Sequence, residues 1–417
     1  MKVCIHRGTQ EVGGTCIEIE SQGRRIALDV GLPLDAADSA DNLPLVDGFQ
    51  ERRESLLGVV ISHPHLDHYG LAHYLPLNTQ MIMGGATERI LKTAALFTPT
   101  GVKFENVIHL EPAKSLSVGP FTITAYLNDH SAYDAYSLLI SAEGRRLFYS
   151  GDFRGHGRKK ALFERLLKHP PSDVDVLLME GTTIGRSGSE ADLRTEEELE
   201  NCFQEQINNT KGMVLVWTSG QNIDRIVTVF KACKKSGRQL VLDLYTAEIL
   251  RATGNPSLPQ AEWSGVKVFL PESQKRQILK TQQFGLSDQY KDYRIYPEQL
   301  VRNAARSVML FRPSMSGELE KAGCLGDAKL IYSLWPGYLN RKELRSFREW
   351  LEKHGIPLTH CHTSGHASPQ DLQRFAKAIA PKMLVPIHSF ATHRFEEFFE
   401  NVQMKEDRQW WEVPHVK

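Results

Sequence analysis

The chain has 417 residues, 41% of them hydrophobic and 24% charged, which is ordinary for a globular protein of about two domains. Its 50 basic residues balance 50 acidic ones, so the charge does not favour a large non-specific duplex-binding surface, although a local basic groove is compatible with it. The sequence shows no apolar stretch of membrane-spanning length and no apolar core of a signal peptide near its first residue, so no membrane partner is expected.

The six cysteines are scattered and form no CxxC pair. This pattern predicts reduced packing thiols and a cytoplasmic protein. The cysteines are Cys4, Cys16, Cys202, Cys233, Cys324 and Cys361.

The first part of the chain reads mainly as strands with turn signals between them. A helix is expected at 87–96, and 142–144 marks a hairpin turn. The expected strands are 2–6, 16–20, 25–29, 58–61, 121–126, 136–140, 146–150 and 174–179.

The middle of the chain alternates strands with helices, which predicts a parallel α/β sheet. Residues 186–189 look like a flexible exit, after which Thr195 and Glu198 form a capping-box pattern that opens a helix. The following elements are expected at 213–217, 223–234, 239–244 and 329–334. An amphipathic helix at 341–354, a helix from Ser368 and a strand ending at His388 complete the chain.

One short run carries the strongest chemical signal, because three histidines and an aspartate fall within six residues after a buried strand. In an extended segment, residues two apart share a side, so His63, His65 and Asp67 can point the same way, with His68 at the following turn. Neutral imidazole and carboxylate are ligands of zinc and manganese. Four such groups on one loop can serve two metal ions.

Further candidate ligands stand at the ends of later strands. His130 follows 121–126, Asp152 follows 146–150 and His388 ends the last strand, while Asp29 ends an early one. Each alone reads equally well as a loop or turn residue. Together, and in this order, they favour a metal centre.

These motifs resemble those of the metallo-β-lactamase superfamily. The resemblance implies that His63, His65 and His130 hold one metal, that Asp67, His68 and His388 hold the other, and that Asp152 bridges them. It also implies that Asp29 orients a ligand histidine. The cofactor would be two zinc ions, or manganese in their place, sharing a hydroxide that attacks the substrate.

Three more motifs resemble motifs A, B and C of the β-CASP nucleases, which include ribonuclease J. They are Glu180 after the strand at 174–179, His366 in the run Ser364-Gly365-His366, and His388. The resemblance implies that His366 assists at the scissile phosphate, that Glu180 orients His366, and that both act with Asp67 in catalysis. In this family a histidine at motif C is typical of enzymes that act on RNA.

Four residues are candidate substrate contacts. Asn222 and Arg225 lie in a segment that resembles, in weaker form, a phosphate-contacting segment of ribonuclease J relatives, and Arg225 reads equally well as a solvated helix residue. Arg154 belongs to a basic cluster after Asp152, with a solvated loop as the alternative. Ser364 stands in motif B.

The resemblance implies an α/β protein with a four-layer αββα metallo-β-lactamase domain built from 1–188 and 341–417, and an inserted α/β β-CASP domain at 189–340. The expected function is metal-dependent hydrolysis of single-stranded RNA by a compact relative that lacks the C-terminal domain of ribonuclease J, and a homodimer is compatible with this. The motif at 388–390 reads His-Ser-Phe where many relatives have His-Gly-Glu. The alternatives are a DNA nuclease, a small-molecule ester or thioester hydrolase, and an inactive binding scaffold.

Overall fold

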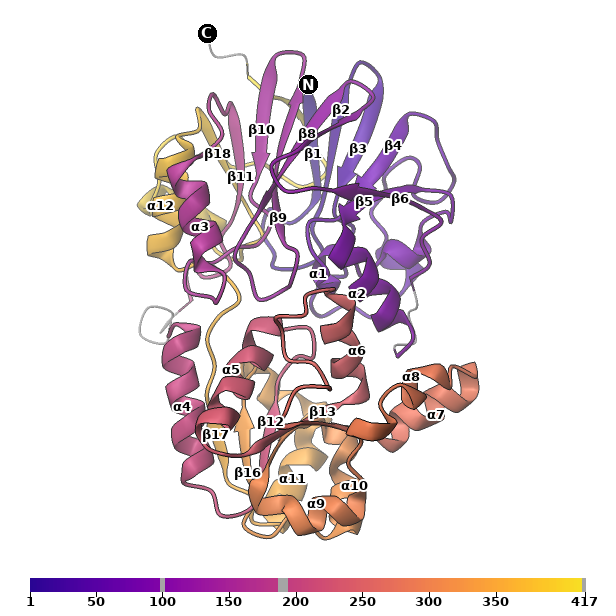
Figure 1. Ribbon diagram of the computed structural model, residues 1–417. Helices are drawn as coiled ribbons and strands as arrows, with labels where there is room; N and C mark the ends of the chain where they lie inside the picture. The colour runs from indigo at the N-terminus through magenta and orange to yellow at the C-terminus, as the bar shows by residue number, and fades with distance from the viewer. Residues whose placement is uncertain (98–101, 187–193, 415–417) are drawn as a thin grey trace. The chain divides into compact units, whose positions relative to one another are not determined.

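The computed structural model describes residues 1–97, 102–186 and 194–414, and the chain divides into two compact units with separate sheets (Figure 1). The first unit comprises Met1–Ala95, Pro99–Leu193 and Gly365–Lys417, and the second comprises Leu96–Thr98 and Arg194–Ser364. Within the described ranges, no helix has both the length and the apolar character needed to cross a membrane.

The first unit contains a seven-stranded and a six-stranded sheet. In spatial order, the seven-stranded sheet consists of β19 (Trp410–Glu412), β1 (Lys2–Arg7), β2 (Cys16–Ser21), β3 (Arg24–Leu28), β4 (Leu56–Val60), β5 (Gln80–Gly84) and β6 (Asn106–Leu110). The six-stranded sheet consists of β18 (Met383–Ile387), β11 (Val176–Glu180), β10 (Arg145–Tyr149), β9 (Tyr136–Ala142), β8 (Phe121–Leu127) and β7 (Ser115–Val118).

The core of this unit lies between its two sheets because alternate residues of each strand point inward. Ile17 and Ile19 of β2 belong to the same buried cluster as Ile123 of β8 and Ile140 of β9. Two further clusters cover the outer faces. The helices there are α1 (Leu66–Tyr69) and α2 (Gly85–Ala95) on one face, and α3 (Lys160–Lys168) and α12 (Pro369–Ile379) on the other. The expected four-layer αββα arrangement is confirmed.

The second unit is built around one six-stranded sheet in which every neighbouring pair of strands is parallel. The order is β14 (Val266–Phe269), β13 (Gln239–Asp243), β15 (Ser307–Leu310), β12 (Val214–Trp217), β16 (Lys329–Tyr332) and β17 (Leu358–His360). Its helices of seven or more residues are α4 (Glu196–Asn208), α5 (Ile223–Lys235), α6 (Leu244–Ala252), α7 (Glu272–Thr281), α9 (Pro297–Asn303), α10 (Ser316–Ala322) and α11 (Arg345–Lys353).

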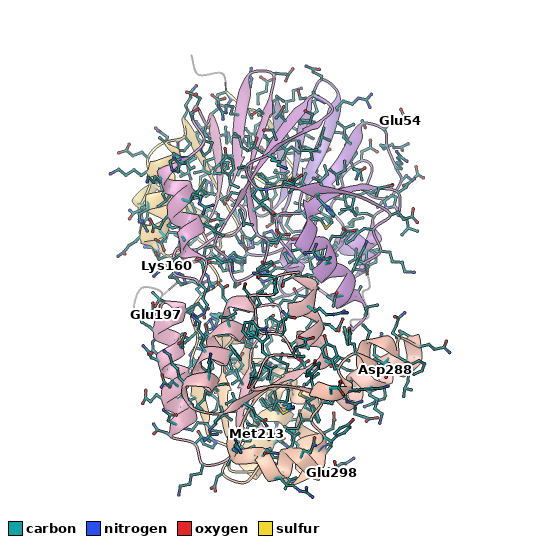
Figure 2. All side chains as sticks on the ribbon, viewed as in Figure 1. Glu54, Lys160, Glu197, Met213, Asp288 and Glu298 are labelled. Atoms are coloured by element: carbon teal, nitrogen blue, oxygen red, sulfur yellow. A yellow bond between two sulfur atoms is a disulfide. The ribbon has the colours of Figure 1, made fainter. Side chains whose placement is uncertain are left out.

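Local signals and burial agree in this unit. The predicted capping box at the start of α4 is present, with the Thr195 side chain accepting from the backbone N–H of Glu198. Figure 2 shows Met213 inside the unit, whereas Asp288 and Glu298 are exposed. The parallel α/β sheet expected from the alternating pattern is therefore confirmed.

The second unit extends beyond the expected boundary at residue 340. Strand β17 pairs in parallel with β16, and Phe347 and Trp350 of α11 stack on Phe311 in the core of this unit. The amphipathic helix expected to lead back to the first domain therefore belongs to the second unit, and the first unit resumes at Gly365. The expected boundary at 188/189 lies outside the described residues, as does most of the expected exit at 186–189.

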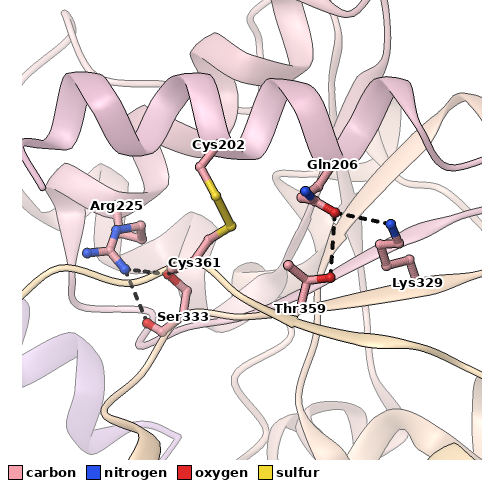
Figure 3. Close-up of a disulfide and its surroundings, with 7 residues drawn as sticks. All are labelled: Cys202, Gln206, Arg225, Lys329, Ser333, Thr359 and Cys361. Atoms are coloured by element: carbon pink, nitrogen blue, oxygen red, sulfur yellow. Dashed lines mark hydrogen bonds between the residues drawn. A yellow bond between two sulfur atoms is a disulfide. The ribbon is translucent and has the colours of Figure 1, made fainter. Parts of the chain in front are cut away.

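The cysteine prediction was wrong for one pair. Cys202 of α4 and Cys361, which follows β17, form a disulfide across a Cα–Cα distance of 6.5 Å (Figure 3). The two residues are 159 positions apart, so only the tertiary structure brings them together. The other four cysteines are buried and unbonded to one another.

Candidate metal centre

The loop that carries the histidine–aspartate run is held by the backbone of residues 30–32. Val30 and Leu32 donate backbone hydrogen bonds to the carbonyls of His68 and Leu66, at 2.8 and 2.9 Å. Between them, Gly31 lies so close that a Cβ added there would sit 1.8 Å from the Asp67 carbonyl oxygen. The close approach that only glycine permits thus fixes where the loop lies.

The remaining candidate ligands also stand just beyond strands of the first unit. His130 lies three residues beyond the end of β8, Asp152 three beyond the end of β10, and His388 directly follows β18. His388 has a positive φ of 50°, and its N–H donates to the Gly8 carbonyl at 2.7 Å. Strands β8, β10 and β18 of one sheet therefore deliver residues distant in sequence to one end of the sandwich.

The structure brings the seven expected ligands together as two groups. The candidate donor atoms within each group all lie within 4.8 Å of one another. The groups are His63, His65 and His130, and Asp67, His68, Asp152 and His388. Asp152 Oδ2 lies 3.8 Å from His63 Nε2 and 3.1 Å from His68 Nε2, so its carboxylate lies between the two groups.

Buried nitrogen atoms test whether these groups suit a metal. His63 Nε2, His130 Nδ1 and His388 Nε2 are buried and make no hydrogen bond to any described residue. The second ring nitrogen of His63 lies 3.0 Å from Ser62 Oγ, and that of His388 lies 3.0 Å from Thr182 Oγ1. Buried polar atoms normally have partners, and metal-bound histidines typically use one nitrogen for the metal and the other for an outer partner. The donor set fits two divalent ions of the zinc or manganese type.

The protonation of the first group also suits metal binding. Burial lowers the pKa of His65 to about 4, and burial together with the nearby His68 lowers the pKa of His63 well below its usual 6.5. Burial likewise lowers the pKa of His130. These rings are therefore neutral at pH 7 and offer the lone pairs that a metal ion requires.

Asp29, which the family resemblance implies to be the residue that orients a ligand histidine, lies beside His68 of the second group. Asp29 Oδ2 lies 2.7 Å from His68 Nδ1, and both side chains are buried. Burial disfavours the charged form of His68, but Asp152 and Asp29 raise its pKa well above 6.5 in the metal-free chain. In the metal-free chain this ring therefore favours its protonated form, and a metal ion bound here would take the place of the Nε2 proton.

Glu180 and His366 lie beside these groups. Glu180 Oε2 is 3.0 Å from His366 Nδ1, and Glu180 Oε1 accepts the backbone N–H of Phe153 at 3.0 Å. His366 Nδ1 is also 3.6 Å from Asp152 Oδ2. The backbone of Phe153 thus fixes the carboxylate that orients the His366 ring.

The four expected substrate contacts are placed differently. Arg154 is fully buried, and its Nε lies 3.7 Å from Asp129 Oδ1, so it is not a solvated loop residue. Arg225 is fully buried too, with its guanidinium bonded to Glu196 and the carbonyls of Ser333 and Thr363. Both arginines hold internal carboxylates, and neither geometry favours a phosphate contact.

The other two expected contacts lie in the second unit, as Arg225 does. The side chain of Asn222 caps α5 by accepting a backbone N–H at 3.0 Å. Ser364 is the last residue of this unit and is half-buried. The structure gives Asn222 a local structural role.

Several positioning residues were not anticipated from the sequence. Ser62, Tyr149 and Thr182 contact Asp29 or a candidate ligand, and Lys159 Nζ donates to the His130 carbonyl at 2.8 Å. Ser62 adjoins the histidine–aspartate motif, and Tyr149 lies three residues before Asp152. This closeness to candidate ligands was the only hint in the sequence for these two residues. Serine, tyrosine and threonine are too common at strand ends for this closeness to indicate a role at a metal centre.

A four-layer sandwich with paired histidine and aspartate groups at its strand ends is the metallo-β-lactamase fold. Residues 25–241 match the model of the beta-lactamase superfamily domain, and the chain belongs to this superfamily.

Named relatives extend this similarity beyond the matched domain. The chain is 23% identical to "Ribonuclease J" of Helicobacter pylori over 94% of its own length and 56% of that protein. It is also 23% identical to an "RNase J-like protein" of Methanocaldococcus jannaschii over 60% of this chain and 59% of the relative. The chain thus spans little more than half the length of these two curated relatives.

A solved structure shares the fold over nearly the whole chain. The crystal structure of a protein of unknown function from Enterococcus faecalis matches with a TM-score of 0.78 and 21% identity. It covers 98% of this chain and 99% of the other, so the arrangement of elements occurs in another protein.

Proposed function

We propose that this chain is a metal-dependent ribonuclease that hydrolyses phosphodiester bonds in single-stranded RNA. The observation that carries the proposal is the Glu180–His366 pair beside the seven-residue donor set. It adds a well-oriented imidazole to groups that already suit two metal ions. The relatives named ribonuclease J at low identity support RNA as the substrate class.

Each residue of the site would have its own role in the proposed hydrolysis. The groups around His63 and His68 would hold two divalent ions, which when bound supply an activated water nucleophile and neutralise charge on a phosphate. His366 would hold the scissile phosphate or give a proton to the departing oxygen, as a positioned general acid does. Glu180 would keep the His366 ring aimed. Asp152 would keep the two metal positions at a fixed separation.

The test is cleavage of matched, end-labelled single-stranded RNA and DNA with added zinc or manganese. His65→Ala should abolish cleavage, whereas His109→Ala should not, because the His109 side chain is half-exposed on β6 and pairs with Glu88, which is not among the expected ligands. His366→Ala should slow turnover by about 10²–10⁴-fold. Its RNA binding should remain close to that of the unchanged chain.

Each alternative gives a different pattern. Equal cleavage of RNA and DNA would replace the proposal with a nuclease of broader substrate range. Failure to cut either, by protein shown to hold two metal ions per chain, would overturn the nuclease assignment and favour an ester or thioester substrate. The fragment ladder would separate endonucleolytic from 5′-exonucleolytic attack.

A further inference from the structure

Asp29 receives an unusual number of donors for one buried side chain. Its Oδ1 accepts the backbone N–H of Ser62 at 2.7 Å, and its Oδ2 accepts the Ser62 hydroxyl at 2.8 Å. The Tyr149 hydroxyl donates to the same Oδ2 at 2.6 Å, and His68 Nδ1 lies 2.7 Å from it. Asp29 and Ser62 are fully inaccessible to solvent, and Tyr149 is 1% exposed. Protein groups therefore determine where the carboxylate points.

The backbone at Asp29 departs from the conformation of the strand before it. Asp29 follows β3 and has a φ of 58°, in the left-handed region that an aspartate tolerates at some cost. The direction of the Asp29 side chain is therefore not set by the extended backbone of β3 alone. Donors from β10 and from the ligand loop hold the side chain in place.

The orientation of Asp29 controls which nitrogen of His68 can face a metal. Because Asp29 has only acceptor atoms when ionised, the His68 Nδ1 must carry the hydrogen that it shares with Oδ2. His68 Nε2 is then left to face Asp152 Oδ2, 3.1 Å away. A rotated Asp29 would release the ring and allow the other tautomer.

We propose that Tyr149 is a positioning residue of the metal centre, acting through Asp29 to present His68 Nε2 to the ion of the second group. The inference rests on the metal-binding part of the proposed function and not on the substrate. Strand β10 would then serve the centre twice, through the Tyr149 hydroxyl and through Asp152 three residues later. Burial and the charge of Asp29 raise the pKa of Tyr149 well above 10, so the hydroxyl remains a donor.

The chain offers a matched control for removal of this hydroxyl. Tyr136 of β9 is also buried, and its hydroxyl donates to the Asp134 carboxylate at 2.8 Å. Asp134 in turn accepts the Thr87 backbone N–H at the start of α2 and touches none of the expected ligands. Tyr136→Phe therefore removes the same kind of hydrogen bond from the same unit at a carboxylate other than Asp29, while the Tyr136 backbone keeps its bond to the Ser62 carbonyl.

The experiment measures zinc and cobalt affinity by competition with a chelator, together with the absorption spectrum of the cobalt-loaded protein. Tyr149→Phe should lower the affinity for one of the two ions by about 10-fold. This is the lower end of the loss seen when an outer partner of a metal ligand is removed. It should also alter the cobalt spectrum of that ion alone. Tyr136→Phe should bind both ions as the unchanged chain does.

A second background separates positioning from general loosening of the fold. If Tyr149 acts through Asp29, Tyr149→Phe should add no further loss of affinity to Asp29→Asn. Two tightly bound ions of unchanged affinity in Tyr149→Phe would overturn the inference while leaving the proposed ribonuclease intact. Equal losses in Tyr149→Phe and Tyr136→Phe, or a further loss in the Asp29→Asn background, would overturn it as well. Absence of metal binding in the unchanged chain would overturn both proposals.

Discussion

Reducing the Cys202–Cys361 disulfide should destabilise the second unit. The bond joins α4, near the beginning of this unit, to the segment after β17, near its end. Figure 3 shows Cys361 of that segment beside Arg225 and Ser333. Ser333 donates to the Cys361 carbonyl, and Arg225 donates to the Thr363 carbonyl. Cleavage of the bond would leave the folded contacts in place but free the unfolded chain to adopt many more conformations.

The size of the effect follows from the length of chain that the bond encloses. The two cysteines are 159 positions apart. The chain-entropy relation gives roughly 5 kcal/mol at 25 °C for a closed loop of about 160 residues, while measured disulfides are typically worth about 2–4 kcal/mol. With a urea dependence of about 2 kcal/mol per molar, the unfolding midpoint should fall by about 1–2 M.

Tryptophan fluorescence is a suitable probe, because four of the six tryptophans lie in the second unit. Unfolding in urea would be followed with and without reductant. The double variant Cys202→Ala/Cys361→Ala should unfold at the lower midpoint under both conditions. Cys233→Ala, which removes a buried unbonded thiol from the same unit, should retain the response to reductant.

Two results would refute this reasoning. Six titratable thiols in the unfolded, unreduced protein would show that the bond does not form. An unchanged midpoint on reduction, with four thiols titrating beforehand, would show that the enclosed loop contributes nothing to stability.

Three further outcomes are expected. Gly31→Ala should lower the metal content per chain measured by elemental analysis, because its Cβ would lie 1.8 Å from a backbone oxygen of the ligand loop; Gly317→Ala, with open space around it, should not. Burial and the charge of Arg225 lower the pKa of His362 to about 3, so below pH 6.5 the unfolded chain binds a proton that the folded chain does not. The free energy of unfolding, measured in urea, should therefore fall by about 2 kcal/mol through this group between pH 7 and pH 5. In His362→Gln the fall over the same range should be smaller by that amount. Arg225→Leu should lower the free energy of unfolding in urea by about 3–5 kcal/mol, because it removes the charged partner of the buried Glu196 carboxylate. Unchanged stability with weaker RNA binding would restore a phosphate-contacting role.

The sequence was most informative where ligands stand at fixed distances from strands. His63, His65 and Asp67 follow a buried strand, and His130, Asp152 and His388 each stand just past another. A buried strand can be predicted from its run of apolar residues, and a polar residue that follows it must lie at the end of the sheet. The grouping of the seven residues is thus a consequence of strand order, which the family resemblance supplied.

The boundary of the second unit could not be read in the same way. The helix α11 has a clear apolar face, and periodicity correctly predicted a helix there. The apolar face of a helix does not indicate which of two hydrophobic cores the helix packs against. Phe311, which directly follows β15 and lies more than thirty residues earlier, stacks against Phe347 and Trp350. That pairing depends on tertiary packing alone.

The positioning residues mark a deeper limit of sequence reasoning. A metal ligand must be histidine, aspartate or another of a few residue types, so its identity carries information. A residue that orients a ligand needs only one donor or acceptor in the right place, which Ser62, Tyr149, Thr182 or a backbone N–H can each supply. Many sequences can meet that requirement, so the residue type alone does not disclose it. The two buried tyrosines illustrate this point, since both donate to a carboxylate, and only the position of that carboxylate beside His68 gives Tyr149 a part in the metal centre.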